Sequence, residues 1–240
     1  MSTTTYPTQL VLPGQVAAPE GPVDMKMMYL MHHAFRRDLN KFAAAVAATP
    51  ADDVDTWRAL GGRWELFFEV LHKHHSGEDA GVWPFLLERA DAEERATLEA
   101  MEEEHSHIDP LLTACAEGFA TLAGDRQGID AEDVRRALKV RIEATRDALA
   151  RHLAHEETDA IAILQRYMTN EDWERLEQEH FRERTPLKQL FGAVPWVVDG
   201  LPATTRDQLF AELGGPFKLI WVLARRSYRR QQDRALKYVS

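Results

Sequence analysis

Apolar residues recur at alternating intervals of three and four positions through four long stretches of this chain. This spacing lines one face of an α-helix, whereas the period-two alternation typical of strands is absent. Each stretch places a histidine inside its apolar line, which we call the core stripe of that helix. The four histidines are His32, His74, His105 and His152. The chain is therefore predicted to be all-α, with one imidazole from each long helix facing the interior.

Helices are expected along these stripes, and shorter helices are expected after them. Asp130, Thr169 and Thr204 each precede an aspartate by three residues, a spacing that predicts a capped helix start. Bends in the second helix are expected at Gly77, Gly81 and Pro84. The expected helices cover residues 24–48, 53–89, 91–123, 130–168, 170–184, 186–200, a short stretch from 204, and 217–239.

Three regions are predicted from this pattern. Residues 1–22 contain four prolines among small polar residues and are expected to form an irregular N-terminal arm. Residues 23–168 hold the four striped helices and are expected to form an up-down four-helix bundle. Residues 169–240 are expected to form a helical C-terminal extension that ends in a basic helix.

The charge of the chain is uneven. A net charge of −10 argues against general binding to nucleic acid, yet residues 216–240 carry seven Lys or Arg and one acidic residue. A basic amphipathic helix of this kind can contact a membrane surface or an acidic partner, although packing on the acidic bundle is the favoured interpretation. One cysteine, no signal-peptide pattern and no long apolar run predict a cytoplasmic protein.

Two core stripes carry a glutamate one turn after the histidine, at Glu78 and Glu156. A buried carboxylate is costly unless a cation lies beside it, so the stripes predict a metal pair. The predicted ligands are His32, His74, Glu78, His105, His152 and Glu156. Four further histidines lie off the stripes and are expected to orient ligands, add one, or relay protons, with a solvated surface position as the alternative: His33, His75, His107 and His155.

Four segments surround these residues: His32-His33-Ala34-Phe35, His74-His75-Ser76-Gly77-Glu78-Asp79, Glu104-His105-Ser106-His107 and His152-Leu153-Ala154-His155-Glu156-Glu157. Over about residues 25–168, they resemble the hemerythrin-like (HHE cation-binding) family. The resemblance implies an up-down four-helix bundle that holds two non-haem iron ions with an oxo or hydroxo bridge. It assigns the same six stripe residues as ligands and implies peroxide, O2 or NO as the small ligand.

The third helix departs from the oxygen carriers of that family, which have a second histidine four residues from the first. The two corresponding positions hold Met101 and Asp109. A thioether suits iron poorly, whereas Asp109 could add a ligand, accept an imidazole N–H or pair with Arg36. A carboxylate in place of an imidazole favours ferric iron, so we expect binding or reduction of small oxidants, with hydrogen peroxide first. A catalase-like or peroxidase-like activity would follow.

Three alternatives stay open. Sensing or binding of O2, NO or iron without turnover would use the same ligands. A ferritin-like carboxylate bundle would use Glu-x-x-His pairs, which occur at Glu102–His105 and Glu177–His180. A zinc site is compatible with the residue types, although six nitrogen and oxygen donors suit iron better than a tetrahedral ion.

Overall fold

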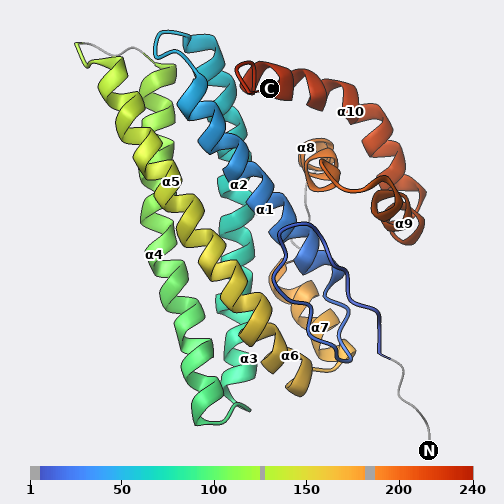
Figure 1. The fold of residues 1–240 in the computed structure, drawn as a ribbon. Coiled ribbons are helices and arrows are strands. Elements are labelled where there is room, and N and C mark those ends of the chain that lie inside the picture. The colour runs from blue at the N-terminus through green and yellow to red at the C-terminus, as the bar shows by residue number, and fades with distance from the viewer. Residues whose placement is uncertain (1–5, 125–127, 182–186, 240) are drawn as a thin grey trace, which may run out of the picture. The chain divides into compact units, whose positions relative to one another are not determined.

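The computed structural model describes residues 6–124, 128–181 and 187–239, and within these ranges the chain is helical without any strand (Figure 1). The four long helices are α1 (Lys26–Ala48), α2 (Val54–Gly77), α4 (Ala92–Ala123) and α5 (Ala131–His155). Two of them continue through a π-helical turn into a shorter helix: α2 through η1 (Glu78–Val82) into α3 (Trp83–Leu87), and α5 through η2 (Glu156–Ala160) into α6 (Ile161–Tyr167). The remaining elements are α7 (Asn170–Leu176), η3 (Glu177–Phe181), α8 (Leu187–Val198), α9 (Ala203–Leu213) and α10 (Gly215–Ala235).

These bounds follow the predicted helices closely, and two of the three predicted caps are present. Thr169 and Asp172 form a reciprocal capping box at the start of α7, and Asp130 accepts the backbone N–H of Glu132 at the start of α5. The cap predicted at Thr204 is wrong, because α9 already begins at Ala203 and its N-cap residue Pro202 has no side chain able to accept a hydrogen bond.

The chain divides into two compact units, and every long helix contributes to both. The first unit lies within Met1–His33, Val70–Pro110 and Asp147–Arg184, and the second within Ala34–Glu69, Leu111–Arg146 and Thr185–Ser240. The first unit takes the beginnings of α1 and α4 and the ends of α2 and α5, so the chain direction alternates as in an up-down bundle. The predicted domain boundaries near residues 22 and 168 stay predictions.

The N-terminal arm is irregular as expected in its described part, and it is fixed within the first unit. The backbone N–H of Val23 donates to Gln165 Oε1 at 2.9 Å, and Gln165 Nε2 donates back to Val23 O at 2.8 Å. Gly21 packs so closely here that an added Cβ would lie 2.3 Å from Gln165 Oε1. Leu12 is also buried, so the arm is part of the packed structure.

The second unit has an aromatic core. The Phe42 ring centroid lies 5.0 Å from that of Trp64 and 5.7 Å from those of Phe67 and Phe119. Edge-on contacts of this kind add to the stabilisation from area burial. Within the same unit α10 packs against α8 and α9 of the C-terminal extension, and its Tyr228 hydroxyl accepts from Arg63 of the bundle helix α2 at 3.4 Å. Packing of the basic helix on the bundle as a whole stays a prediction. A membrane or acidic-partner contact through residues 216–240 stays a prediction.

None of the helices in the described ranges combines the length and the apolar character that a membrane crossing needs.

Candidate metal centre

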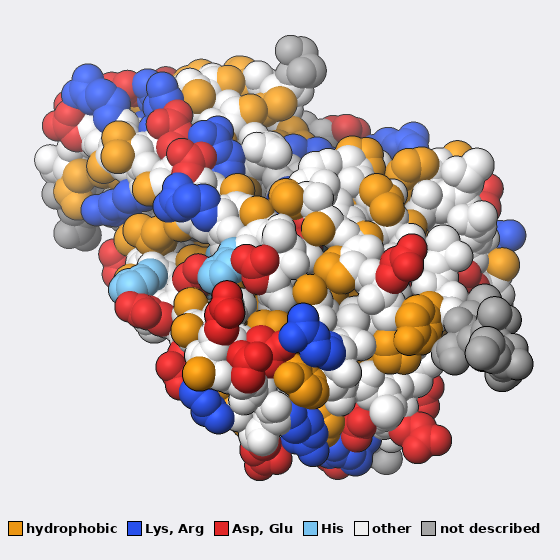
Figure 2. Space-filling view, turned by 60° about the horizontal axis from the view of Figure 1, so that its bottom comes forward, with side chains coloured by type: hydrophobic (Ala, Val, Ile, Leu, Met, Phe, Trp, Pro, Cys, Tyr) orange, Lys and Arg blue, Asp and Glu red, His pale blue; other side chains and the backbone are white. Residues whose placement is uncertain are grey.

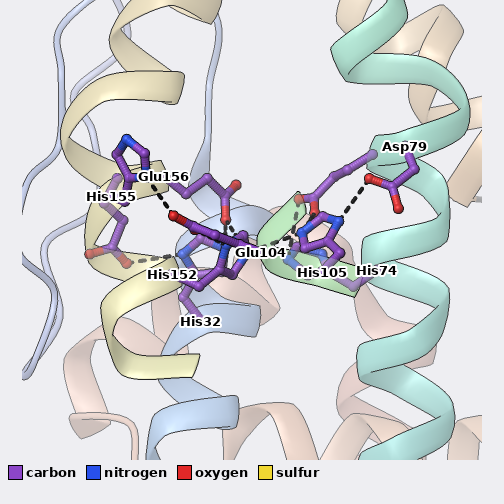
Figure 3. A network of polar contacts seen from close by, with 10 residues as sticks. His32, His74, Asp79, Glu104, His105, His152, His155 and Glu156 are labelled. Carbon is purple, nitrogen blue, oxygen red and sulfur yellow. Dashed lines mark hydrogen bonds and ion pairs between the residues drawn. The ribbon is translucent and has the colours of Figure 1, made fainter. Parts of the chain in front are cut away.

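Seven buried side chains of the first unit converge from the four long helices and their π-helical extensions, and Figure 3 labels five of them, His32, His74, His105, His152 and Glu156. They are His32 from α1, His74 and His75 from α2, Glu78 from η1, His105 from α4, His152 from α5, and Glu156 from η2. Both glutamates are completely buried. Charged carboxylates are rarely found at such depth unless a partner compensates them, which marks this cluster as a candidate site.

The seven side chains form two groups, and within each group the donor atoms lie within 4.8 Å of one another. The first group contains His32, His74, Glu78 and Glu156. The second group contains His75, His105 and His152. Imidazole nitrogens and carboxylate oxygens at this spacing can each surround one metal ion, so the cluster offers two neighbouring ion positions.

The two carboxylates lie between the groups. Glu78 places Oε1 3.3 Å from His74 Nε2 in the first group and Oε2 3.6 Å from His105 Nε2 in the second. Glu156 Oε2 lies 3.2 Å from His32 Nε2 and 3.8 Å from His152 Nε2. Each carboxylate therefore faces both groups.

Three further carboxylates hold imidazole rings from outside the cluster. His105 Nδ1 donates to Asp79 at 2.7 Å and His152 Nδ1 donates to Glu104 at 2.8 Å. His32 Nδ1 donates to Glu157 at 3.0 Å. An imidazole that donates its Nδ1–H outward presents the lone pair of Nε2 inward, which is the tautomer and orientation that a metal ligand needs.

The arm contributes to this outer layer. Glu157 accepts the backbone N–H of Val16 through its other oxygen at 2.8 Å. The carboxylate that orients His32 is thus itself held in place by the N-terminal arm.

The π-helical turns explain how one short segment supplies both a ligand and a ring-holding carboxylate. Glu78 and Glu156 each begin a π-helical segment, and in both the backbone N–H five residues later bonds to the glutamate carbonyl. A π turn is wider than an α turn and rotates the following side chains relative to the regular helix. Glu78 then faces the cluster while Asp79 reaches His105.

Several of these buried atoms form no hydrogen bond with any residue that the structure describes. They are both oxygens of Glu78, both oxygens of Glu156, Nε2 of His32 and both ring nitrogens of His75. A native protein satisfies nearly all of its buried polar groups, and each exception calls for a partner. Metal cations supply that partner for carboxylate oxygens and imidazole nitrogens together, so these residues fit a metal pair.

Burial and mutual repulsion set the protonation of the metal-free cluster. Burial, together with the Glu156 charge, holds the pKa of Glu78 well above its ordinary value. Burial and the neighbouring imidazoles lower the pKa of His74 to about 3. Burial also acts to lower the pKa of His32, but the Glu156 and Glu157 carboxylates outweigh it and raise that pKa to about 9. Without metal the cluster therefore keeps a proton on His32 near neutral pH, and burial favours the protonated form of Glu78.

A chain of contacts runs from the cluster to the surface. Glu104 accepts from His152 Nδ1 through one oxygen and from His155 Nδ1 through the other, at 2.8 and 2.9 Å. His155 Nε2 lies 3.6 Å from Asp159, whose side chain is 54% exposed. Figure 2 shows a face of the molecule on which histidine side chains reach the surface beside acidic ones. Hydrogen bonds thus connect the buried His152 ring to Glu104 and His155, whose side chains are 33% and 30% exposed.

All six predicted stripe residues lie in the cluster, and His75 joins them. His75 lies off the predicted stripe but is buried in the second group, which excludes the surface alternative and agrees with one of its expected roles, that of an additional ligand. Adjacent residues on a helix point about 100° apart, and α2 faces two neighbours here. The His74 ring meets the edge of His32 with 5.4 Å between centroids, whereas the His75 ring stacks on His105 at 3.9 Å.

The other candidates lie outside both groups. His33 is buried, with Nδ1 3.4 Å from the carbonyl oxygen of Pro13 in the arm. His107 is exposed on α4. Asp109 is partly exposed, and its Oδ2 lies 3.9 Å from His72 Nδ1.

Sequence reasoning gave no role to Asp79, Glu104 and Glu157, which hold the rings. A signal was present, because each directly adjoins a predicted ligand in the sequence: Asp79 follows Glu78, Glu104 precedes His105, and Glu157 follows Glu156. The ferritin-like alternative gains nothing from the geometry. Of the residues in its two Glu-x-x-His pairs, only His105 belongs to the two groups found among the described residues, and Glu102, Glu177 and His180 do not.

Comparison with protein families supports the reading of these residues. The family model of the hemerythrin HHE cation binding domain matches residues 24–164, which are 141 of the 240 residues. Comparisons with curated proteins and with solved structures gave no match. The matched range includes all seven residues of the cluster and the three carboxylates that orient their rings. The chain therefore belongs to the hemerythrin HHE cation-binding family.

Proposed function

We propose that this protein holds two iron ions in the cluster and uses them to bind and reduce a small oxidant, with hydrogen peroxide as the first candidate. The first ion would be held by His32 and His74, and the second by His75, His105 and His152. Glu78 and Glu156 would bridge the two. The single observation that carries the proposal is the position of these two carboxylates, each of which faces both donor groups.

The donor set supports iron over zinc. With both carboxylates bridging, the second ion would have five donors, one more than a tetrahedral zinc site uses, and the donors mix nitrogen and oxygen as iron prefers. They are nevertheless fewer than two six-coordinate ions take. Positions therefore remain at which a small ligand can bind.

The burial of the cluster limits the size of the ligand. Among the five imidazoles, the most exposed residue is His74, at 6%. A molecule of a few atoms, such as peroxide, O2 or NO, suits such a site. The apolar surroundings also exclude bulk water, which strengthens the electrostatic interactions inside.

Acid–base groups beside the cluster favour turnover over reversible carriage. The missing imidazole on the third helix no longer disfavours carriage, because His75 supplies a fifth imidazole. Disproportionation converts two H2O2 into one O2 and two H2O, so one peroxide gives up two electrons and two protons and the other takes them. Bound iron would supply the electron transfer. Glu104 and His155 can hold and pass the protons at their carboxylate oxygens and ring nitrogens.

The test combines metal content with turnover. Purified protein reconstituted anaerobically is expected to hold two iron ions per chain and to release O2 when peroxide is added. His155→Gln is expected to slow O2 release several-fold with unchanged iron content, whereas His107→Gln, which alters an exposed histidine outside this chain of contacts, leaves the rate unchanged. An iron content below one per chain refutes the metal pair. Two iron ions without O2 release refute peroxide disproportionation and favour O2, NO or iron sensing.

A further inference from the structure

The second unit contains an open cavity of about 550 Å³ that the proposed metal chemistry does not use. It lies among the end of α8, the turn that follows it, the beginning of α9 and the length of α10, with Lys41 of α1 at one wall. Figure 1 shows α8, α9 and α10, which bound it. The volume falls within the range of small-molecule sites, which is roughly 300–1,000 Å³.

The cavity is cationic within a chain whose net charge is −10. Four cationic side chains line it against two carboxylates, Asp199 and Asp233. Asp199 is already engaged, since Lys41 Nζ lies 2.7 Å from its Oδ2. By contrast, Arg225 and Arg229 form no ion pair with any carboxylate in the described ranges. Arg206 pairs with Asp207 at 3.3 Å, and Asp233 sets one negative charge against the two of Arg225 and Arg229, so the cavity keeps a net positive charge.

The arginines are partly ordered by an aromatic ring. The guanidinium carbons of Arg206 and Arg225 lie 5.1 and 4.9 Å from the centroid of the Trp221 ring. Cation–π contacts at these distances restrain both side chains before any ligand arrives. Arg225 and Arg229 are also four residues apart on α10, so their side chains project from one face of the helix.

A buried acceptor adds a second requirement. The Oε1 atom of Gln232, another lining residue, is buried and accepts no hydrogen bond from the residues that the structure describes. Because this oxygen is inaccessible to solvent, a ligand among the arginines would reach it only after the Gln232 side chain rotates toward the cavity, and the ligand would then need an N–H or O–H donor.

We propose that this cavity binds a small organic phosphate, in which a phosphate monoester is attached to a body that carries hydrogen-bond donors. A phosphate monoester offers a double negative charge and three oxygens, enough to engage more than one guanidinium at once. The body would lie along Trp221, with a donor directed at Gln232. The proposal is independent of the metal centre, because none of these residues touches it.

The test uses the full-length, metal-loaded protein and isothermal titration calorimetry with three probes. Adenosine monophosphate carries both the phosphate and the donors, adenosine lacks the phosphate, and inorganic phosphate lacks the body. Adenosine monophosphate is expected to bind at least about tenfold more tightly than either of the others, since charge-assisted hydrogen bonds are involved. Failure to bind it at millimolar concentration, or equal binding of inorganic phosphate, overturns the proposal.

A matched pair of variants separates a site from diffuse attraction. Arg225→Gln with Arg229→Gln removes two charges from the cavity wall, and affinity for adenosine monophosphate is expected to fall about tenfold or more. Arg226→Gln with Arg230→Gln removes two equally exposed charges from the same helix outside the cavity, and affinity is expected to change less than about twofold. Equal losses in both variants overturn the proposal.

A third variant tests the acceptor. Gln232→Glu places a carboxylate beside the arginines, where it competes with the phosphate, so binding of adenosine monophosphate is expected to fall about tenfold while thermal stability is retained. Unchanged affinity in this variant contradicts the assigned role of Gln232 and the orientation of the ligand.

Discussion

Buried carboxylates occur in both units of this protein, and Asp38 of the second unit differs from Glu78 and Glu156 of the first in the hydrogen bonds that it accepts. Asp38 in the second unit is completely buried, and both of its oxygens are used: Arg37 and Arg63 donate to Oδ1 at 2.8 and 2.7 Å, and Trp196 Nε1 donates to Oδ2 at 2.8 Å. Glu78 and Glu156 in the first unit are just as deeply buried but accept no hydrogen bond within the described chain. The charge of Asp38 is therefore compensated by side chains of its own unit, whereas Glu78 and Glu156 need an added cation.

Along one stripe, the same helices thus supply core-packing residues in the second unit and residues of the buried cluster in the first. In the second unit the stripe of α1 carries Phe42, which packs among aromatic rings, whereas in the first it carries His32. Aromatic packing stabilises the fold without any ligand. The comparison predicts that mutations in the second unit change stability directly and leave metal content intact, while mutations of the cluster in the first unit change metal content and affect stability through the bound metal.

The largest effect is expected for Asp38→Ala. Removing this carboxylate leaves two guanidinium groups buried without their anion, which costs about 3–5 kcal/mol of unfolding free energy. Urea denaturation measures this loss, and iron per folded chain should stay unchanged. Asp55→Ala, which removes a carboxylate that is 93% exposed, is the control and should cost less than about 0.5 kcal/mol. A loss below about 1 kcal/mol for Asp38→Ala would show that the Asp38 cluster is not compensated as described.

Metal removal should have the next largest effect, and it should act through the first unit. Metal ions present at a thousandfold excess over their Kd stabilise the folded chain by about 4 kcal/mol of unfolding free energy. A chain of this size loses roughly 2–4 °C of Tm for each kcal/mol of unfolding free energy that it loses. Chelation is therefore expected to lower Tm by about 10 °C in differential scanning calorimetry.

The matched variant for this experiment is Glu78→Gln with Glu156→Gln. It removes the carboxylates that need a cation, so its Tm should not respond to chelator and should lie at or above that of the metal-free native chain. A native chain whose Tm is the same with and without chelator contradicts the role assigned to these carboxylates.

The residues of the buried cluster in the first unit could be predicted from the sequence better than the contacts of Asp38 in the second unit. The helix bounds and the six stripe residues followed from periodicity, because an α-helix buries one face and the spacing of apolar residues reports which face it is. His75 escaped this reasoning because α2 meets both His32 and His105, so two adjacent residues can point inward toward different helices. A single stripe cannot represent a helix with two buried directions.

The compensation of Asp38 could not be predicted at all. Its partner Trp196 lies 158 positions further along the chain and its partner Arg63 lies 25 positions away, and nothing local in the sequence links them. The carboxylates that hold the imidazole rings, Asp79, Glu104 and Glu157, were less predictable than the stripe residues and more predictable than the contacts of Asp38. They adjoin the ligands in sequence, but their direction depends on the π turns, which no spacing rule indicated.

A smaller effect is expected where the outer carboxylates are changed. Glu104→Gln removes the anion that orients His152 and is expected to weaken metal binding about 10–100-fold, measured by competition with a chelator. Glu103→Gln alters the neighbouring exposed glutamate and should leave metal affinity unchanged. If both variants bind metal equally well, the contact between Glu104 and His152 is structural only.

The smallest effect concerns protons, and it shows how the first unit manages its charges without metal. In the metal-free chain the pKa of His32 is raised from 6.5 to about 9, so a protonated imidazole stands beside Glu156 where a metal ion would otherwise stand. This interaction stabilises the folded state fully below pH 6.5 and is lost as the pH rises through about 9. NMR titration of the metal-free chain should give a midpoint near 9 for His32, and Glu156→Gln should lower it because the anion is removed. A midpoint at or below 6.5 in the native chain would mean that burial outweighs the carboxylates. With the expected result, proton and metal compete for the same nitrogen, so metal affinity rises with pH over the range in which His32 loses its proton.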